Sequence, residues 1–285
     1  MGYIFISKNS TSIVTIGYLP RVKIDNILNE DLIKYCKNNK IAYLRVDPID
    51  SKNKYSNFKE ITNKFKHYGL NIKKSEPIQL PKTVIINLEK SENDLLKQMK
   101  HKHRYNIKLA EKKGVQVKIA ESEKAFNEFL NLYQETVKRQ KYTGRSSDYI
   151  SKLYFLGLKN NSVKIATAYY KSKPLASWFL LLDGDYVNYL YGGSSEEHRN
   201  LMPAYKLLWE CILWAKNKGF KYFDLYGLKN DEHSGFTRFK LGFVEKDNSQ
   251  IIEYVDTFDI VFNRKIYTLL RIMENIRKFV LFKIK

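Results

Sequence analysis

The segment from residue 163 to residue 228 constrains the fold more than any other part of the chain. Three apolar runs, VKIATAYY, PLASWFLLL and YVNYLYGG, are separated by short polar segments at 171–173 and 183–185, which predicts three strands joined by tight turns. A helix is predicted next, beginning at Pro203 and ending before Gly219. Its apolar stripe has helical spacing: Ala204, Leu207, Leu208, Cys211, Ile212 and Ala215. A further strand, KYFDLYG, completes an α/β pattern.

The first part of the chain also alternates strands with helices. Strand-like runs YIFIS, SIVTIGYL, AYLRVDP and KTVIINLE are interleaved with the helical segments DLIKYCKNNK and SNFKEITNKFKHYG. Between the two parts, an N-cap serine at position 91 and Gly114 bound another helical segment. A chain of 285 residues, 44% of them hydrophobic, can bury one large core or two smaller ones.

Charge is the strongest compositional feature. Lys and Arg number 50 against 30 Asp and Glu, which gives a net charge of +20 at pH 7. A surface this basic attracts polyanions, either a nucleic acid or an anionic membrane face. No run approaches the roughly 18 apolar residues of a membrane span, and the N-terminus lacks a signal-peptide pattern. The two cysteines, Cys36 and Cys211, fit no motif spacing, so we expect a cytoplasmic protein.

Several catalytic classes lack their residues here. The sequence contains no Ser-His-Asp order, no CxxC pair and no phosphate-binding P-loop motif. His101 and His103 fall on different faces of one predicted helix, and the other histidines are isolated, so we predict no metal site. The segment GFTRFKLGF, residues 235 to 243, instead surrounds Lys240 with phenylalanines. That lysine is either a solvated charge at a strand end or an ammonium held against a negative group.

Six short motifs follow one another in a particular order: KHRYNIKLAEKKGV, TGRSSDY, YLYGGS, PAYKLLWE, FDLYG and FKLGF. With this order and spacing, the chain resembles the FemABX family, the aminoacyl-tRNA-dependent transferases of peptidoglycan bridge synthesis. The resemblance implies an α/β (α+β) fold of two acetyltransferase (GNAT)-like domains. The first would comprise residues 1–88 and 256–285, including the C-terminal helix, and the second residues 89–255.

The resemblance also implies an activity and its site. An amino acid would pass from tRNA to the side-chain amine of the third residue of the peptidoglycan stem peptide, without a cofactor besides the aminoacyl-tRNA co-substrate. Phe239 and Lys240 match the family's Phe-Lys pair at the reaction centre. Four positions match those that hold the UDP-linked muramyl peptide in compact members: Thr143, Arg145, Tyr149 and Tyr191.

The chemistry of this reaction assigns roles to some of these residues. An aminoacyl ester is already activated, so the enzyme must align the reactants, accept a proton from the attacking amine and stabilise an oxyanion. We expect Lys240 to stabilise that developing charge and not to act as a nucleophile. Asp224, in FDLYG, is the best-placed carboxylate to accept the proton, although we favour a structural role for it. On the residues alone, Arg145 is equally well explained as a solvated loop residue. Tyr191 is either a core tyrosine or a ligand contact, since the two glycines beside it would let a ligand approach the backbone.

Two departures from the family pattern bear on the acceptor. The long helical arm of members that add several glycines has no counterpart here. The N-terminus is also short: the opening portion of the family's first domain, which supplies a basic residue to the nucleotide diphosphate in the family, has no counterpart here. A UDP-linked and a lipid-linked muramyl peptide are therefore both open as acceptors.

Basic segments indicate further partners. Four basic residues on or beside one predicted helix are candidates to contact tRNA phosphates, the alternative being a solvated basic face: Lys100, Lys102, Arg104 and Lys108. The family resemblance implies that most of the C-terminal helix packs on the first domain. Its last nine residues are apolar and basic enough for peripheral contact with the anionic inner face of the cell membrane. We expect a monomer.

Two other functions share parts of this pattern. A CoA-dependent GNAT N-acyltransferase needs a glycine-rich turn opening a helix to bind the pyrophosphate, whereas this chain has HRNLMPAYK at the matching place. A non-catalytic tRNA-binding or membrane-binding adaptor is the other alternative, which the intact Phe239–Lys240 pair disfavours.

Overall fold

The computed structural model of the protein describes residues 5–8, 14–55, 57–141, 144–229, 231 and 234–283. The chain forms two compact units, Met1–Lys82 with Glu253–Lys285 and Thr83–Ile252. The sequence predicts boundaries at 88/89 and 255/256, which would leave strand β5 (Lys82–Asn87) in the first domain. In the structure β5 pairs antiparallel with β10 (Tyr222–Asp224), in the sheet of the second unit.

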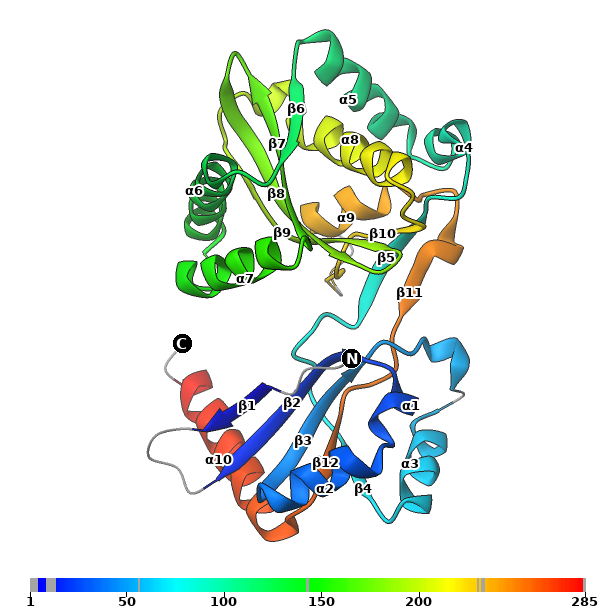
Figure 1. Cartoon of the computed structure of the whole chain (residues 1–285), viewed down its shortest axis with the longest axis vertical. Coiled ribbons are helices and arrows are strands. Elements are labelled where there is room, and N and C mark those ends of the chain that lie inside the picture. The colour runs from blue at the N-terminus through cyan, green and yellow to red at the C-terminus, as the bar shows by residue number, and fades with distance from the viewer. Residues whose placement is uncertain are drawn as a thin grey trace. The chain divides into compact units, whose positions relative to one another are not determined.

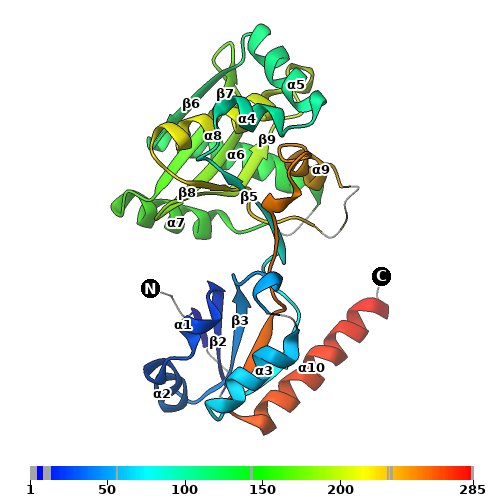
Figure 2. The same cartoon turned by 90° about the vertical axis from the view of Figure 1, so that its right-hand side faces the viewer.

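The first unit contains, within its described residues, a five-stranded sheet in the order β1-β2-β3-β12-β4. Strands β2 and β3 are parallel, and the other neighbours are antiparallel. The strands are β1 (Phe5–Lys8), β2 (Thr15–Val22), β3 (Ile41–Pro48), β4 (Asn71–Lys74) and β12 (Phe258–Val261). Helices α1 (Ile24–Ile27), α2 (Glu30–Asn38) and α3 (Phe58–His67) cover one face, and α10 (Arg264–Lys283) covers the other (Figure 1, Figure 2).

Alternation along β3 gives the two faces of this sheet different chemistry. Leu44 and Val46 lie in the apolar core beneath α1, α2 and α3. Arg45 points the other way and forms a bidentate pair with Asp259 of β12, whose side chain is 0% exposed, with N–O distances of 2.8 and 3.0 Å. Tyr267 of α10 donates its hydroxyl to the same carboxylate over 3.1 Å. The C-terminal helix is therefore attached through this ionic network and through edge-on contact of Tyr267 with Tyr43 on β3, and not through the main core.

The second unit contains, as far as it is described, a seven-stranded sheet in the order β11-β5-β10-β9-β8-β7-β6. Its remaining strands are β6 (Gln116–Ala120), β7 (Val163–Tyr170), β8 (Lys173–Asp183), β9 (Tyr186–Ser194) and β11 (Ile251–Glu253). Helices α5 (His101–Lys112) and α8 (Pro203–Asn217) cover one face, and α6 (Glu123–Gln140) and α7 (Ser147–Lys159) cover the other; α4 (Glu92–Lys97) precedes α5 (Figure 1). The predicted run of three strands, a helix and a strand is confirmed as β7, β8, β9, α8 and β10.

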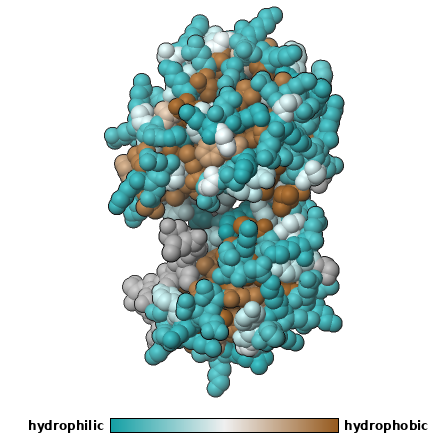
Figure 3. Space-filling view, turned by 45° about the vertical axis from the view of Figure 1, so that its right-hand side comes forward, coloured by the Kyte–Doolittle hydropathy of each residue, from teal (hydrophilic) through white to brown (hydrophobic). Residues whose placement is uncertain are grey.

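One of the two interpretations of Lys240 from the sequence, a solvated charge at a strand end, does not fit the structure, because the segment GFTRFKLGF is not a strand. It forms a seven-residue helix, α9 (Gly235–Leu241). Ser234 caps this helix, because its hydroxyl accepts the backbone N–H of Thr237 over 3.2 Å. Hydrophilic side chains cover much of the face of each unit that Figure 3 shows, as the net charge of +20 requires.

Candidate functional site

Lys240 projects from α9 into the interior of the second unit. Its side chain is only 1% exposed. The Nζ atom donates to the backbone carbonyls of Tyr226 and Gly227, each over 2.9 Å, and lies 3.9 Å from the ring centre of Phe236. The ring of Tyr189 on β9 is 5.2 Å from the same atom. A buried amine is thus held between two carbonyls and two aromatic faces.

Burial governs the protonation of Lys240. Removal from water lowers the pKa of its amine from 10.5 to about 7. The charge of Asp224 has a smaller effect, which raises this pKa. The ammonium and the neutral amine therefore have similar free energies near neutral pH. A group in this state can supply a positive charge or exchange a proton without a large change in free energy.

Asp224 shapes the loop that supplies the two carbonyls. It is buried at the end of β10, and its Oδ1 accepts the Thr83 hydroxyl and, over 2.7 Å, the backbone N–H of Tyr226. Tyr226 and Gly227 have positive φ angles of 53° and 84°, a conformation that needs such support at a tyrosine. These contacts favour the structural role expected for Asp224.

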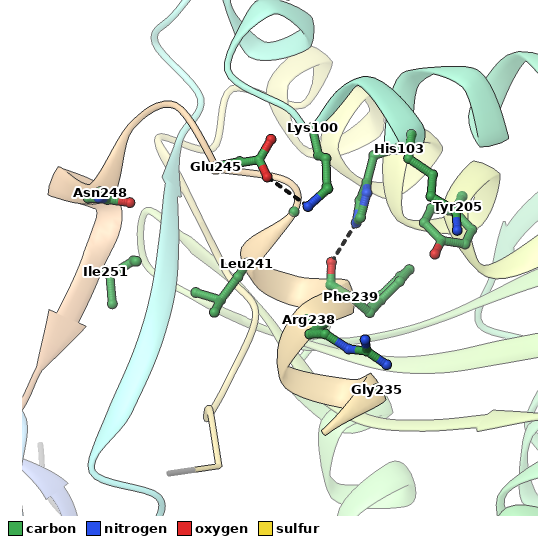
Figure 4. A pocket seen from close by; sticks show the side chains of 12 residues that line it. Lys100, His103, Tyr205, Gly235, Arg238, Phe239, Leu241, Glu245, Asn248 and Ile251 are labelled. Atoms are coloured by element: carbon green, nitrogen blue, oxygen red, sulfur yellow. Dashed lines mark hydrogen bonds and ion pairs between the residues drawn. The ribbon is translucent and has the colours of Figure 1, made fainter. Parts of the chain in front are cut away.

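Phe239 leaves α9 in a different direction from Lys240, its neighbour in the helix. Its ring lies 5.1 Å from Tyr205 of α8 and 5.4 Å from Phe243. It lines a cavity of about 940 Å³ that Lys240 does not line (Figure 4). Charged side chains also line this cavity: Lys100, Lys102, Arg238 and Glu245. The two members of the Phe-Lys pair therefore face different environments, although they are adjacent in one short helix.

Three of the four predicted acceptor-binding residues lie together. The guanidinium of Arg145, in the loop between α6 and α7, lies 5.4 Å from the ring centre of Tyr149. The Arg145 backbone N–H donates to the hydroxyl of Tyr133 over 2.9 Å, and the Tyr133 ring meets Tyr191 edge-on at 5.9 Å. Burial, and then Tyr149, raise the pKa of Tyr191 above its usual value. Thr143 lies outside the described residues.

Because of a bulge, strand β9 contributes one tyrosine to this cluster and another to the surroundings of Lys240. Leu180 pairs with Tyr189 and its neighbour Phe179 pairs with Tyr191, so β9 carries one extra residue between them. The bulge turns two tyrosines that are two positions apart to opposite faces of the sheet: Tyr189 stacks on Trp178, whereas Tyr191 contacts Phe179. The sequence predictions did not include Tyr189. Strict alternation would place it on the same face as Tyr191, so its contact with Lys240 depends on the bulge.

The glycine pair after Tyr191, for which the sequence suggested close approach of a ligand, lies against other parts of the fold. A Cβ atom on Gly193 would lie 2.3 Å from the backbone of Leu132 and Tyr133 in α6. A Cβ atom on Gly192 would lie 2.1 Å from the hydroxyl of Tyr189. Gly193 is therefore required for the contact between β9 and α6, whereas a side chain at Gly192 would displace the ring of Tyr189.

The four basic residues that the sequence predicts to contact tRNA phosphates line two separate cavities and not one continuous surface. Lys100 and Lys102 line the cavity beside Phe239. Arg104 and Lys108 line a second cavity of about 670 Å³, together with Trp209. The helical spacing of α5 separates the two pairs. Within the part of the chain that the structure describes, no group of His, Cys, Asp or Glu side chains could hold a metal ion.

Comparison with known proteins identifies the family of the chain. Residues 20–171 and 158–275 match the model of the FemAB family. The chain is similar to the aminoacyltransferase FemA of Staphylococcus epidermidis, with 24% identity over 330 aligned residues, 87% of this chain and 78% of FemA. Among solved structures, FemX has a TM-score of 0.78 at 18% identity, over 93% of this chain and 85% of FemX.

A second solved structure supports the same fold. The C-terminal domain of a putative lysylphosphatidylglycerol synthetase from Agrobacterium fabrum has a TM-score of 0.57 at 13% identity, over 95% of this chain and 84% of that domain. The fold is therefore the α/β fold of two GNAT-like domains that the sequence predicted. Since the family model matches most of its length, the chain belongs to the FemAB family.

Proposed function

We propose that α9 forms the reaction centre at which this FemAB-family aminoacyltransferase joins an amino acid to a peptidoglycan precursor during interpeptide bridge formation. The observation that carries the assignment is the buried amine of Lys240, held at two carbonyls with a pKa of about 7. The amine of the stem peptide attacks the ester carbonyl of aminoacyl-tRNA and loses a proton, an amide bond forms, and the tRNA ribose hydroxyl leaves. A positive charge in a low-dielectric setting stabilises the oxyanion of that step.

The donor substrate, aminoacyl-tRNA, is assigned to the side of α9 that carries Phe239. Lys100, Lys102 and Arg238 line the same cavity as Phe239, and cations there suit the phosphates near the acceptor end of tRNA. Arg104 and Lys108, in the second cavity, would contact phosphates further along the strand. Because the ester is already activated, this chemistry needs no cofactor.

The acceptor is assigned to the cluster of Arg145, Tyr149 and Tyr191. UDP-linked and lipid-linked muramyl peptides share a diphosphate, and an Arg guanidinium binds two phosphate oxygens at once. Arg145→Met should therefore raise the KM for the acceptor by about 10-fold to 100-fold, with a smaller change in kcat. Initial rates at varied acceptor concentration measure this. Arg199→Met is the control, because Arg199 is exposed in the same unit; an equal change in both variants contradicts the assignment.

The CoA-dependent alternative is disfavoured where α8 begins. The segment before this helix contains no glycine, Met202 has a φ angle of 55°, and Pro203 at the first helical position has no N–H to offer a pyrophosphate.

The test of the proposed function is transfer of labelled amino acids from a charged total-tRNA pool to UDP-linked and lipid-linked muramyl pentapeptides. Transfer to either acceptor supports it, tRNA binding without transfer favours an adaptor, and acetyl transfer from acetyl-CoA favours the rival enzyme.

The C-terminal helix is assigned to contact with an anionic membrane surface. The side chains of the last nine residues, for which the sequence predicts this contact, lie outside the described part of the chain, so the assignment uses the preceding turns of α10. Four apolar side chains on one stripe of α10 are each more than half exposed: Leu269, Ile272, Met273 and Ile276. The opposite stripe, with Tyr267, packs on the sheet of the first unit. The α10 sequence holds six Lys or Arg and one Glu, so the charge of the helix complements anionic lipid. None of the described helices is long and apolar enough to cross a membrane.

Vesicle binding tests this assignment. We expect the protein to co-sediment with vesicles of phosphatidylglycerol and phosphatidylcholine, and less with phosphatidylcholine alone. The double variant Ile272→Glu, Met273→Glu should reduce that binding by about tenfold or more, because two charges replace inserted apolar groups. Leu156→Glu, at an equally exposed apolar position of α7, serves as the control and should bind like the wild type. A dimer in light scattering that the double variant dissociates would assign the stripe to a second copy instead.

A further inference from the structure

His103 makes a contact with α9 that the predicted roles of this chain do not use. It lies on α5 with 4% of its surface exposed, and its Nε2 atom is 2.9 Å from the backbone carbonyl oxygen of Phe239 (Figure 4). A carbonyl oxygen can only accept, so Nε2 must carry the hydrogen. The imidazole therefore donates to the residue that precedes Lys240.

The Phe239 carbonyl lacks a partner within its own helix. A carbonyl in the last turn of a helix has no i+4 N–H unless the helix continues. Here the N–H of Phe243, four positions later, donates to the Lys240 carbonyl over 3.1 Å. His103, from an element 136 positions away in the chain, supplies the missing donor.

The packing around the imidazole shows that the contact is built into the fold. The ring meets Tyr205 edge-on at 4.9 Å and Phe243 edge-on at 5.0 Å. A Cβ atom at Gly242 would lie 2.1 Å from Cε1 and 2.3 Å from Nε2 of the ring. Any side chain at position 242 would displace the imidazole, so the glycine of the FKLGF motif is required for this contact.

The surroundings of the other ring nitrogen, Nδ1, determine the charge state of the His103 imidazole. Nδ1 is buried and has no hydrogen-bond partner among the residues that the structure describes. Burial lowers the pKa of His103; the Phe239 carbonyl and Glu245 oppose this, while Lys100 and Lys102 add to it. A second proton, at Nδ1, would be buried without an acceptor beside two lysines. The ring is therefore neutral, with its one hydrogen on Nε2.

We propose that His103 is a positioning residue, which holds the carbonyl of Phe239 and so sets the orientation of α9. Rotation of this short helix would move Phe239 in its cavity and draw Lys240 away from the carbonyls of Tyr226 and Gly227. The proposal rests on the proposed function of the Phe239–Lys240 pair. A displacement of about 1 Å at a reacting centre can lower a rate on the order of 100-fold, so loss of the donor acts on kcat.

Three variants and one control test the role of the donor. His103→Phe keeps a ring but removes the N–H, and it should lower kcat for aminoacyl transfer by about 10-fold to 100-fold with little change in either KM. His103→Gln retains an N–H that can reach the carbonyl and should restore most of kcat. Gly242→Ala displaces the ring with His103 still present and should resemble His103→Phe. His101→Phe, at an exposed position of the same helix, should match the wild type.

The pH profile separates positioning from general destabilisation. Protonation of His103 places an N–H at Nδ1 that has no acceptor, so wild-type kcat should fall at acid pH with an ionisation that His103→Gln lacks. Equal kcat and equal profiles in the wild type, His103→Phe and Gly242→Ala would overturn the proposal. If His103→Phe does not fold, Gly242→Ala and His103→Gln still decide the outcome.

A spectroscopic measurement is independent of turnover. In ¹⁵N-histidine spectra, Nε2 of His103 should have the shift of a protonated nitrogen and Nδ1 that of an unprotonated one at neutral pH, assigned with His103→Gln. The opposite tautomer would overturn the inference. Absence of aminoacyl transfer by the wild type, with this tautomer present, would overturn the proposed function instead, so the two failures are distinguishable.

Discussion

Replacing Lys240 by Met is expected to lower kcat/KM for aminoacyl transfer by about 100-fold to 1,000-fold, the usual effect of removing one group that stabilises an oxyanion. Methionine fills nearly the same volume, so the loss would arise from the missing charge and from the two hydrogen bonds to the loop after β10. Transfer from charged tRNA to the muramyl peptide measures it. Lys159→Met, at an exposed position of α7, is the control. Activity within threefold of the wild type would remove Lys240 from the reaction centre.

The same variant should change how stability depends on pH. The folded-state pKa of Lys240, about 7, lies below its ordinary value of 10.5. Between these values the unfolded chain binds more protons, so the free energy of unfolding rises with pH across this window. The rise is at most about 1.4 kcal/mol per pH unit; the stabilisation is complete above pH 10.5 and is lost as pH falls from there to about 7. Urea unfolding of the wild type and Lys240→Met at several pH values should show this slope only in the wild type.

Asp259→Ala is expected to lower the free energy of unfolding of the first unit by about 3–5 kcal/mol. The variant would leave the guanidinium of Arg45, whose side chain is 13% exposed, without its bidentate partner. It would also free Tyr267 and loosen α10. Removing one member of a buried ion pair is costly, because the remaining charge stays desolvated.

The chain offers a specific way to measure this effect. All three tryptophans, Trp178, Trp209 and Trp214, lie in the second unit, so their fluorescence follows that unit alone. Asp259→Ala should shift the denaturation followed by circular dichroism and leave the tryptophan transition in place. Asp256→Ala removes a more exposed ion pair with Lys74 in the same unit, and it should cost less than about 1 kcal/mol. Equal shifts in the two variants would show that the Arg45–Asp259 network contributes little.

The succession of strands and helices could be predicted because it depends on neighbours in the sequence. The turns at 171–173 and 183–185 and the apolar stripe that begins at Ala204 place β7, β8, β9 and α8 correctly. The helix α9 could not be predicted in this way. Seven residues give too little periodicity, and GFTRFKLGF is helical because Ser234 caps it and Thr237, Lys240 and Phe243 are buried.

Some residues of the candidate site could likewise be predicted from the sequence, and others could not. Motif order indicated Phe239, Lys240, Arg145, Tyr149 and Tyr191 as site residues, since motif spacing is a property of the chain itself. It did not indicate that Phe239 and Lys240 face different environments. Nor did it indicate Tyr189 or His103, because one depends on a bulge in β9 and the other on a contact between α5 and α9.

By itself, the sequence determined the family, the α/β class and the residues around which the reaction centre is proposed, because these follow from local periodicity and from the order of motifs. Only the tertiary structure decided that Lys240 is buried, that its pKa is about 7, and that His103 donates to the carbonyl beside it. Burial and electrostatics depend on which distant segments surround a side chain. Lys240 is separated from the loop that binds it by 13 or 14 positions, and Phe239 from His103 by 136. No pattern of neighbouring residues records those distances.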